Sequence, residues 1–226
     1  MFHYDWNWGV VWTYRYAFLQ GLVITAQLSV LSIAVGTLMG LALGTLVSSR
    51  SRSLLPLRRV LLFMIDAIKA LPPLLLLLLF YYWLPYFTGV RSSFWLAAMA
   101  LSVGLSVFVA DVFRHAIAGV PRPLVEACYA LGMTPRIVLR RLVVPEALRS
   151  IVPTLGLLAI DIVKLSSLAS IIAVRELLHR ASEISTYSYR FLEVYGALAL
   201  IYVSILLPFS YGVRWLEGSR LFIRRS

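Results

Sequence analysis

The chain has 226 residues, of which 61% are hydrophobic and 14% are charged, and its formal net charge is +11 at pH 7. This composition is too apolar for a soluble domain of that length, so it predicts a polytopic membrane protein. The basic residues fall in short loops beside apolar runs, where they orient a chain in the bilayer, so the charge does not indicate nucleic-acid binding.

Five apolar runs are long enough to cross the hydrocarbon core as helices, because each crossing needs about 20 residues and must satisfy its backbone hydrogen bonds internally. The runs lie near residues 17–47, 60–87, 94–119, 146–174 and 194–216. No signal peptide is predicted before the first run, since the N-terminus lacks a basic n-region and a small-residue cleavage site. We predict an all-α membrane fold in which the whole chain, 1–226, forms one domain.

The first two runs carry features that affect helix packing. Gly36, Gly40 and Gly44 recur every four residues in the first run and form a face that lets another helix approach closely; ordinary glycine tolerance in membrane helices is the alternative. In the second run Pro72 and Pro73 remove two backbone donors, so we expect the helix to bend or unwind there.

Three acid–base pairs at i, i+3 spacing lie in or near the runs, namely Asp66 with Lys69, Asp111 with Arg114, and Asp161 with Lys164. Such partners on one helix can neutralise each other, and ionised side chains inside a membrane face a bundle interior or a cavity. For the pair in the fourth run, a structural role and a substrate-path role both stay open. The adjacent Ser166 and Ser167 either bind substrate or bond back to helix carbonyls.

The distribution of lysine and arginine predicts the orientation of the chain. Fourteen arginines fall in 48–59, 114–149 and the stretch after residue 213, whereas five fall in the alternate segments, and both lysines lie within runs. Because basic residues concentrate on the cytoplasmic side, the N-terminus is expected outside and the C-terminus in the cytoplasm. The segment 120–145 is then cytoplasmic.

This segment contains the stretch EACYALGMTPRIVLRRLVVP, from Glu126 to Pro145. It predicts a short helix with Pro123 at its first position and Glu126 in its first turn, where the helix dipole favours an anion. Gly132 suits the left-handed position that ends a helix, and Thr134 followed by proline predicts the cap of a second helix.

Apolar and small residues mark one face of the first short helix, namely Val125, Cys128, Tyr129 and Leu131. A cytoplasmic helix with such a face requires either a protein partner or the membrane interface, and the pattern alone leaves both open. Cys128 is the single cysteine, which excludes an internal disulfide, and His3, His115 and His179 lack metal-ligand spacing, so no metal site is predicted.

The stretch from Glu126 resembles the EAA signature of the membrane permease subunits of bacterial ABC importers, E-A-A, three residues, G, nine residues, I-x-L-P. Four residues of this signature are identical in the chain at the required spacing, and Cys128, Leu142 and Val144 are conservative replacements of its other three fixed residues. The stretches from Asp111 to Pro153 and from Ile162 to Ile184 look like the polar amino acid uptake branch, and the N-terminal stretch looks most like glutamate/aspartate-type permeases. Lys69-Ala70-Leu71 stands for that branch's R-G-T, and Lys164-Leu165-Ser166-Ser167-Leu168 for its K-D-T-S-L.

The resemblance implies a type I ABC importer permease fold in the bacterial inner membrane. It implies a second permease subunit, identical or homologous, a cytoplasmic ABC ATPase, a periplasmic solute-binding protein and an amino acid substrate. The chain lacks a phosphate-binding loop, so ATP and Mg are expected on the ATPase, and no cofactor is expected on this chain, which is a transport component and not an enzyme.

The resemblance also assigns three groups of residues. Coupling to the ATPase is expected at Pro121, Glu126, Ala127, Ala130, Leu131, Gly132, Met133 and Pro145. The gate and substrate path are expected at Asp161, Lys164, Ser166, Ser167 and Leu168, and docking of the binding protein at Arg175, Glu176 and Arg180.

Two other classes of membrane protein are alternatives. An ion-coupled secondary transporter is expected to show an inverted repeat, but five spans do not divide into equal halves. An accessory membrane subunit explains a chain without an ATPase site but leaves the EAA spacing unexplained.

Overall fold

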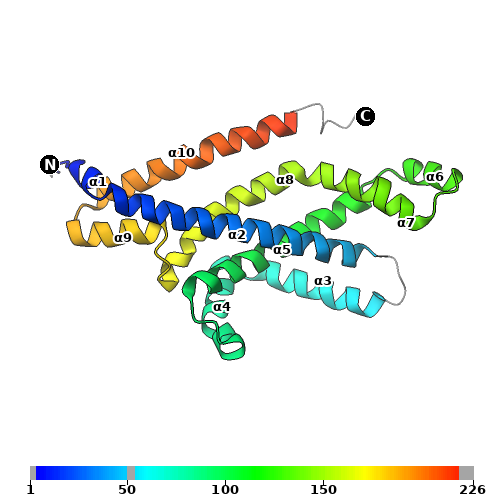
Figure 1. Ribbon diagram of the computed structural model, residues 1–226, viewed down its shortest axis with the longest axis horizontal. Coiled ribbons are helices and arrows are strands. Elements are labelled where there is room, and N and C mark those ends of the chain that lie inside the picture. Colours follow the sequence, from blue (N-terminus) through cyan, green and yellow to red (C-terminus); the bar gives the residue numbers. More distant parts are fainter. Residues whose placement is uncertain (1–3, 50–53, 219–226) are drawn as a thin grey trace. The chain divides into compact units, whose positions relative to one another are not determined.

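A computed structural model describes residues 4–49 and 54–218, and within these ranges every regular element is a helix (Figure 1). The helices are α1 (Gly9–Thr13), α2 (Arg15–Ser48), α3 (Leu55–Ala70), α4 (Pro73–Thr88), α5 (Ser93–Ala118), α6 (Arg122–Ala130), α7 (Pro135–Val138), the π-helix η2 (Leu139–Val143), α8 (Val144–Leu165), the 3-10 helix η3 (Ser166–Ile172), α9 (Leu177–Ser188) and α10 (Phe191–Gly218). His3 and five of the arginines counted for orientation, Arg50, Arg52, Arg220, Arg224 and Arg225, lie outside the described residues.

Among the described residues, four helices are long and apolar enough to cross a membrane, or up to five if a bent pair counts as one span. They are α2, α5, the continuous helix Pro135–Ile172, and α10 from Phe191 to Trp215. The fourth helix begins well before the expected residue 146, because the helix that starts at Pro135 continues into the apolar run without a break.

The expected second span is two helices of 16 residues each, α3 and α4, bent by 108° at Leu71–Pro72. The cause is the proline pair, since neither Pro72 nor Pro73 has an N–H to continue the helix and Pro73 begins the new one. The break predicted from the sequence is therefore confirmed. At 1.5 Å per residue each half is about 24 Å long, less than the hydrocarbon core.

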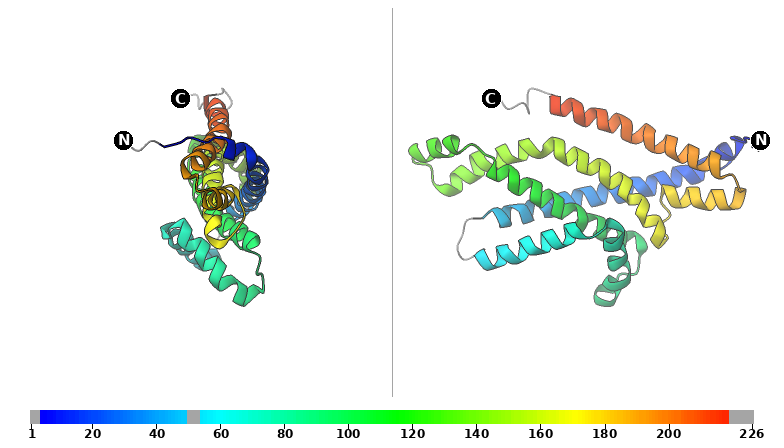
Figure 2. Two further views of the ribbon diagram at one scale, coloured as in Figure 1. Left: turned by 90° about the vertical axis from the view of Figure 1, so that its left-hand side faces the viewer. Right: turned by 180° about the vertical axis from the view of Figure 1, so that it is seen from behind.

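The described residues group into two compact units, each built from discontinuous segments. The first unit contains Met1–Ser32, Pro73–Leu101 and Ile160–Tyr211. Its two apolar clusters centre on Leu28 with Ala97, and on Phe18 with Leu177. Within this unit α1, α9 and the first turns of α10 gather at the same end, which Figure 2 shows from behind.

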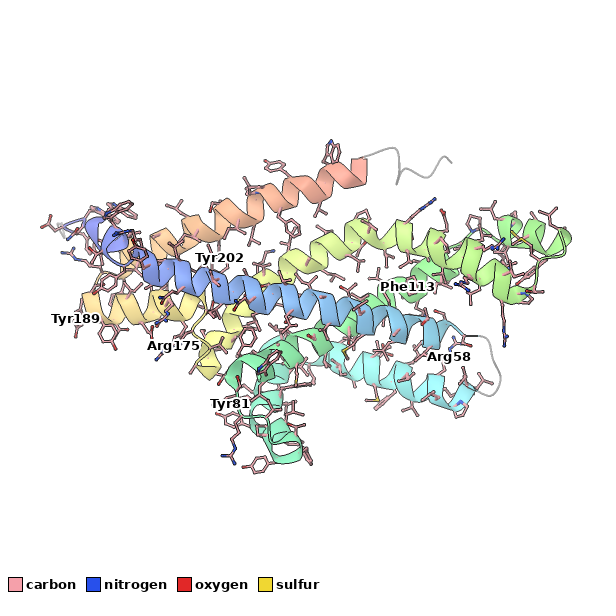
Figure 3. All side chains as sticks on the ribbon, viewed as in Figure 1. Arg58, Tyr81, Phe113, Arg175, Tyr189 and Tyr202 are labelled. Carbon is pink, nitrogen blue, oxygen red and sulfur yellow. The ribbon has the colours of Figure 1, made fainter. Side chains whose placement is uncertain are left out.

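The second unit contains Ile33–Pro72, Ser102–Ala159 and Gly212–Ser226. In it α2 and α5 approach closely along the glycine face. A Cβ built on Gly36 would lie 2.8 Å from the carbonyl oxygen of Ser102, and one on Gly40 would lie 2.5 Å from Cβ of Val109. The glycines spaced by four residues therefore form a packing face, as predicted. Phe113 of α5, labelled in Figure 3, packs in a cluster with Ala147.

Candidate functional site

Helix α6 ends in a Schellman motif, which explains why the sequence needs a glycine at its end. Gly132 has a φ of +77°, a left-handed conformation that only glycine adopts without strain. Its N–H donates to the carbonyl oxygen of Tyr129 at 2.9 Å, and the N–H of Met133 donates to that of Cys128 at 3.1 Å. Thr134 occupies the N-cap position of the next helix, without a side-chain capping hydrogen bond in the described part of the chain, and Pro135 begins that helix. The helix, turn and helix predicted here are confirmed.

The start of α6 differs from the prediction in register. Helix α6 begins at Arg122 with Pro121 as its N-cap, so Pro123 occupies the second position and not the first. Glu126 consequently lies beyond the first turn, which contains no acidic residue, and the helix dipole does not explain its presence. Glu126 is exposed, as are Ala127 and Ala130 of the expected coupling surface.

The apolar residues of α6 divide between two faces, contrary to the single partner face that the sequence suggested. Val125 and Cys128 turn inward and pack with Val120 and Val138 of the second unit. Leu124, Tyr129 and Leu131 remain outside, and Leu131 at the turn is 82% exposed. The outward set, and not the whole predicted face, is available to a partner. Three further expected coupling residues are half-buried, namely Pro121, Met133 and Pro145, whereas Gly132 is exposed.

The charged pair of the fourth span faces outward. Nζ of Lys164 lies 3.2 Å from Oδ1 of Asp161, and the two side chains are 57% and 59% exposed. Ser166 is buried and Ser167 half-buried, and their hydroxyls donate to the carbonyl oxygens of Val163 and Lys164. These contacts are the back-bonding expected of serine in a helix. Leu168 packs against the core around Leu28.

The two arginines expected to dock the binding protein differ in their contacts within the chain. Arg175 is 68% exposed and points away from the ribbon in Figure 3, and among the described residues its Nε lies 3.9 Å from Oε1 of Glu183. Arg180 is held within the chain, since it donates to Oε2 of Glu183 at 3.0 Å and to Oε1 of Gln20 at 3.3 Å. Arg175 is thus available to a ligand, whereas Arg180 is largely committed.

Glu176 is fully buried and caps α9, so its side chain does not lie on the surface where docking of the binding protein was expected. Its carboxylate accepts hydrogen bonds from the backbone N–H groups of Leu178 at 2.9 Å and His179 at 2.7 Å, and from Thr25 of α2 at 3.5 Å. Thr25 in turn accepts from the N–H of Leu177 at 3.1 Å. The sequence offered little signal for this junction, because glutamate is not a usual N-cap residue.

Burial raises the pKa of Glu176 to about 7, from an ordinary value of 4.5, although the N–H groups of Leu178 and His179 oppose that shift. The folded protein thus binds this proton more tightly than the unfolded chain does. The resulting stabilisation is fully present below pH 4.5 and is lost as the pH rises through about 7. The largest contribution consistent with such a shift is about 3 kcal/mol.

We therefore expect the thermal unfolding temperature of the purified protein to decrease as the pH is raised from 5 to 8. Glu176→Gln should make this decrease smaller, because the glutamine side chain cannot ionise. Thermal unfolding in detergent at several pH values measures both. Glu126→Gln, at an exposed carboxylate, is the matched control and should keep the parental slope. An unchanged slope in the Glu176→Gln protein would contradict the assignment.

The lysine of the second span pairs across helices and not with its expected neighbour. Nζ of Lys69 lies 2.6 Å from Oδ2 of Asp111 on α5, while Asp66 is exposed. Oδ1 of Asp111 also lies 2.7 Å from Nη2 of Arg114, so the predicted pair within α5 is present. Lys69 adds a third charge to this pair. A sequence contains no sign of the Lys69 contact because its partner lies 42 residues away.

The described residues contain no group of three or more His, Cys, Asp or Glu side chains that could hold a metal ion.

Comparison with known proteins places these features in a family. A family model described as a binding-protein-dependent transport system inner membrane component matches residues 36–220. The chain belongs to this family. It is therefore a membrane permease component and not an enzyme, and the family match does not favour a secondary transporter or an accessory subunit.

Individual relatives agree with the family over most of the chain. The octopine transport system permease protein OccM of Rhizobium radiobacter is 34% identical over 85% of this chain and 81% of its own length. The L-cystine transport system permease protein TcyB of Bacillus subtilis is 32% identical over 80% and 77%. The glutamine transport system permease protein GlnP of Escherichia coli is 29% identical over 93% and 96%.

Solved structures share the fold. The crystal structure of an amino acid ABC transporter with histidines matches with a TM-score of 0.86 and 31% identity, covering 95% of this chain and 99% of that chain. An inward-facing MetNI methionine ABC transporter matches with a TM-score of 0.73 over 89% and 97%, and at 21% identity it supports the fold alone. The expected all-α permease fold is confirmed.

Proposed function

We propose that this chain is the permease subunit through which an ABC importer moves a polar amino acid into the cytoplasm. The named relatives transport octopine, cystine and glutamine, and the solved relative is an amino acid transporter with histidines. We further propose that all of 1–226 acts as one permease domain, because α2, α5, α8 and α10 each contribute residues to both compact units.

The observation that carries the substrate path is the outward-facing pair Asp161 and Lys164. Both side chains are more than half exposed within an apolar helix long enough to span the membrane. Facing lipid would leave these charges in hydrocarbon, which is costly, so they require a watery cavity or a second protein. A second permease subunit opposite α8 would be that second protein and would enclose a watery cavity with this chain. In that cavity Lys164 attracts a substrate carboxylate.

The ATPase is proposed to bind the outward side of α6 and its turn, at Glu126, Leu131 and their exposed neighbours. An apolar side chain as exposed as Leu131 favours a partner, and the rigid Schellman turn fixes its position. ATP and Mg belong to that partner, and this chain holds no cofactor.

The remaining partners follow from orientation. The basic residues favour an N-terminus in the periplasm and a C-terminus in the cytoplasm of a bacterial inner membrane. The α9 side then faces the periplasm, and Arg175 is the proposed contact for the solute-binding protein, with Glu176 and Arg180 shaping α9 from within.

The substrate role of Lys164 is tested by combining Asp161→Asn with Lys164→Gln. An exposed pair contributes about 1 kcal/mol or less to stability, so the double variant should assemble like the parent. Loss of a charged hydrogen bond to substrate costs about 1.5–3 kcal/mol, so uptake should fall roughly 10- to 100-fold.

Uptake is measured in proteoliposomes containing the full complex, with radiolabelled glutamine, glutamate, cystine and histidine as substrates. Lys164→Arg keeps the charge and serves as the matched control, which should retain most uptake. Near-parental uptake by the double variant would refute the substrate role. If the parental complex transported neither these four compounds nor any other polar amino acid, the proposed substrate class would be refuted.

A further inference from the structure

The N-terminal segment 4–16 is built around large aromatic side chains that stay outside the protein. Five of them are exposed, namely Tyr4, Trp6, Trp8, Trp12 and Tyr16, and Trp12 is 72% exposed. The segment is nevertheless ordered into an extended stretch, the helix α1 and the first turn of α2. Such a concentration of exposed aromatic rings requires an environment other than bulk water.

The segment lies beside the start of α10 in Figure 2, and polar contacts hold the two together. Glu193 is fully buried and accepts hydrogen bonds from the hydroxyl of Tyr4 at 2.5 Å and from the backbone N–H of Asn7 at 2.9 Å. Arg190 donates to the carbonyl oxygen of Asp5 at 2.5 Å. Because the buried Glu193 carboxylate accepts hydrogen bonds from N–H and O–H groups of the segment, the segment is fixed to α10 and its aromatic side chains are held in place.

The exposed rings are arranged with a cation among them. Trp6 and Trp8 stack with ring centroids 5.9 Å apart. The guanidinium of Arg15 lies 4.8 Å from the centroid of Trp12 and 4.6 Å from that of Tyr16, and it donates to the carbonyl oxygen of Trp12 at 2.8 Å. Tryptophan and tyrosine, with apolar bodies and polar tips, prefer the headgroup level of a bilayer, where arginine also meets phosphate.

The same face continues into the membrane along α2. Tyr16, Leu19, Val23 and Val30 are all exposed and recur at spacings of three, four and seven residues, so they form one stripe of a spanning helix. With 34 residues α2 is about 51 Å long, well above the roughly 30 Å hydrocarbon core, so an end of it must lie in the headgroup region.

We propose that residues 4–16 form an interfacial anchor whose aromatic side chains insert at the boundary between phospholipid headgroups and acyl chains, and that Glu193 ties this anchor to α10. The bilayer surface then holds the beginnings of α2 and α10 at a fixed depth. This inference does not depend on the substrate or on the ATPase contact.

Collision measurements on a nitroxide at Trp12→Cys test the proposal, in a Cys128→Ser background that removes the chain's one cysteine. The full complex is reconstituted in phospholipid vesicles, and accessibility to oxygen, which concentrates in the bilayer, is compared with accessibility to a water-soluble nickel chelate. Val30→Cys, on the same stripe, is the bilayer control, and Tyr187→Cys, 77% exposed on α9, is the aqueous control. The nitroxide signal of a labelled Cys128→Ser complex without an introduced cysteine gives the background, which is subtracted.

The oxygen-to-nickel ratio at position 12 should lie between those at positions 187 and 30, and Tyr16→Cys should give a ratio closer to that at position 30. A ratio at position 12 equal to that at position 187 would place the segment in water and overturn the proposal. Low accessibility to both reagents at positions 12 and 16 would show a protein partner covering the rings and would equally overturn it.

Discussion

Replacing Gly40 by leucine is expected to prevent stable folding of the permease, because α2 and α5 leave no room for a side chain there. Even a Cβ at this position would lie 2.5 Å from Cβ of Val109 and 2.6 Å from the carbonyl oxygen of Ser106. Backbone atoms cannot move aside as a flexible side chain does, so the two helices must separate. We expect a loss of about 3 kcal/mol or more in the free energy of unfolding.

The thermal unfolding midpoint and the monodisperse yield in detergent measure this effect. Gly212→Leu is the matched control, since it lies in α10 of the same compact unit and a Cβ there meets no atom within 4 Å. The control should keep the parental midpoint. If Gly40→Leu proved as stable as Gly212→Leu, the close approach of α2 and α5 would be wrong.

Replacing Leu131 by glutamate is expected to uncouple the importer while leaving the permease folded. The side chain is 82% exposed in this chain, so a charge there costs the isolated permease little. In the proposed ATPase contact the same charge would be buried without a partner, and a loss of about 2–3 kcal/mol corresponds to a roughly 30- to 150-fold fall in uptake.

Uptake and substrate-stimulated ATP hydrolysis by the reconstituted complex measure this coupling, and Leu131→Met, which keeps an apolar side chain, should behave like the parent. Because the ATPase acts in the cytoplasm, the same result supports the proposed orientation. Parental uptake and hydrolysis with Leu131→Glu would contradict both the coupling surface and the side assigned to it.

Local features of the fold could be predicted from the sequence because their causes lie within a few neighbouring residues. The break at Pro72 and Pro73 follows from missing N–H groups, and the end of α6 follows from the freedom of Gly132 at positive φ. The four-residue spacing of Gly36 and Gly40 likewise predicted a helix contact, although its partner, α5, was not evident.

The direction in which a side chain faces could not be predicted from the sequence in the same way. Val125 and Cys128 turn inward and pack with Val120 and Val138, whereas Leu124, Tyr129 and Leu131 stay exposed. The helical period of α6 alone is compatible with either arrangement, since it does not say which face the rest of the chain covers.

Taken by itself, the sequence determined that this protein is helical, lies in a membrane, breaks its second span and carries a short helix that ends at a glycine, since composition, backbone preference and short-range spacing suffice for each. Only the tertiary structure decided that Lys69 pairs with Asp111, that Glu176 is buried as a cap, and that Asp161 faces outward with its lysine. The physical reason is that burial and charge pairing depend on which distant helices meet, and residues far apart along the chain determine those contacts.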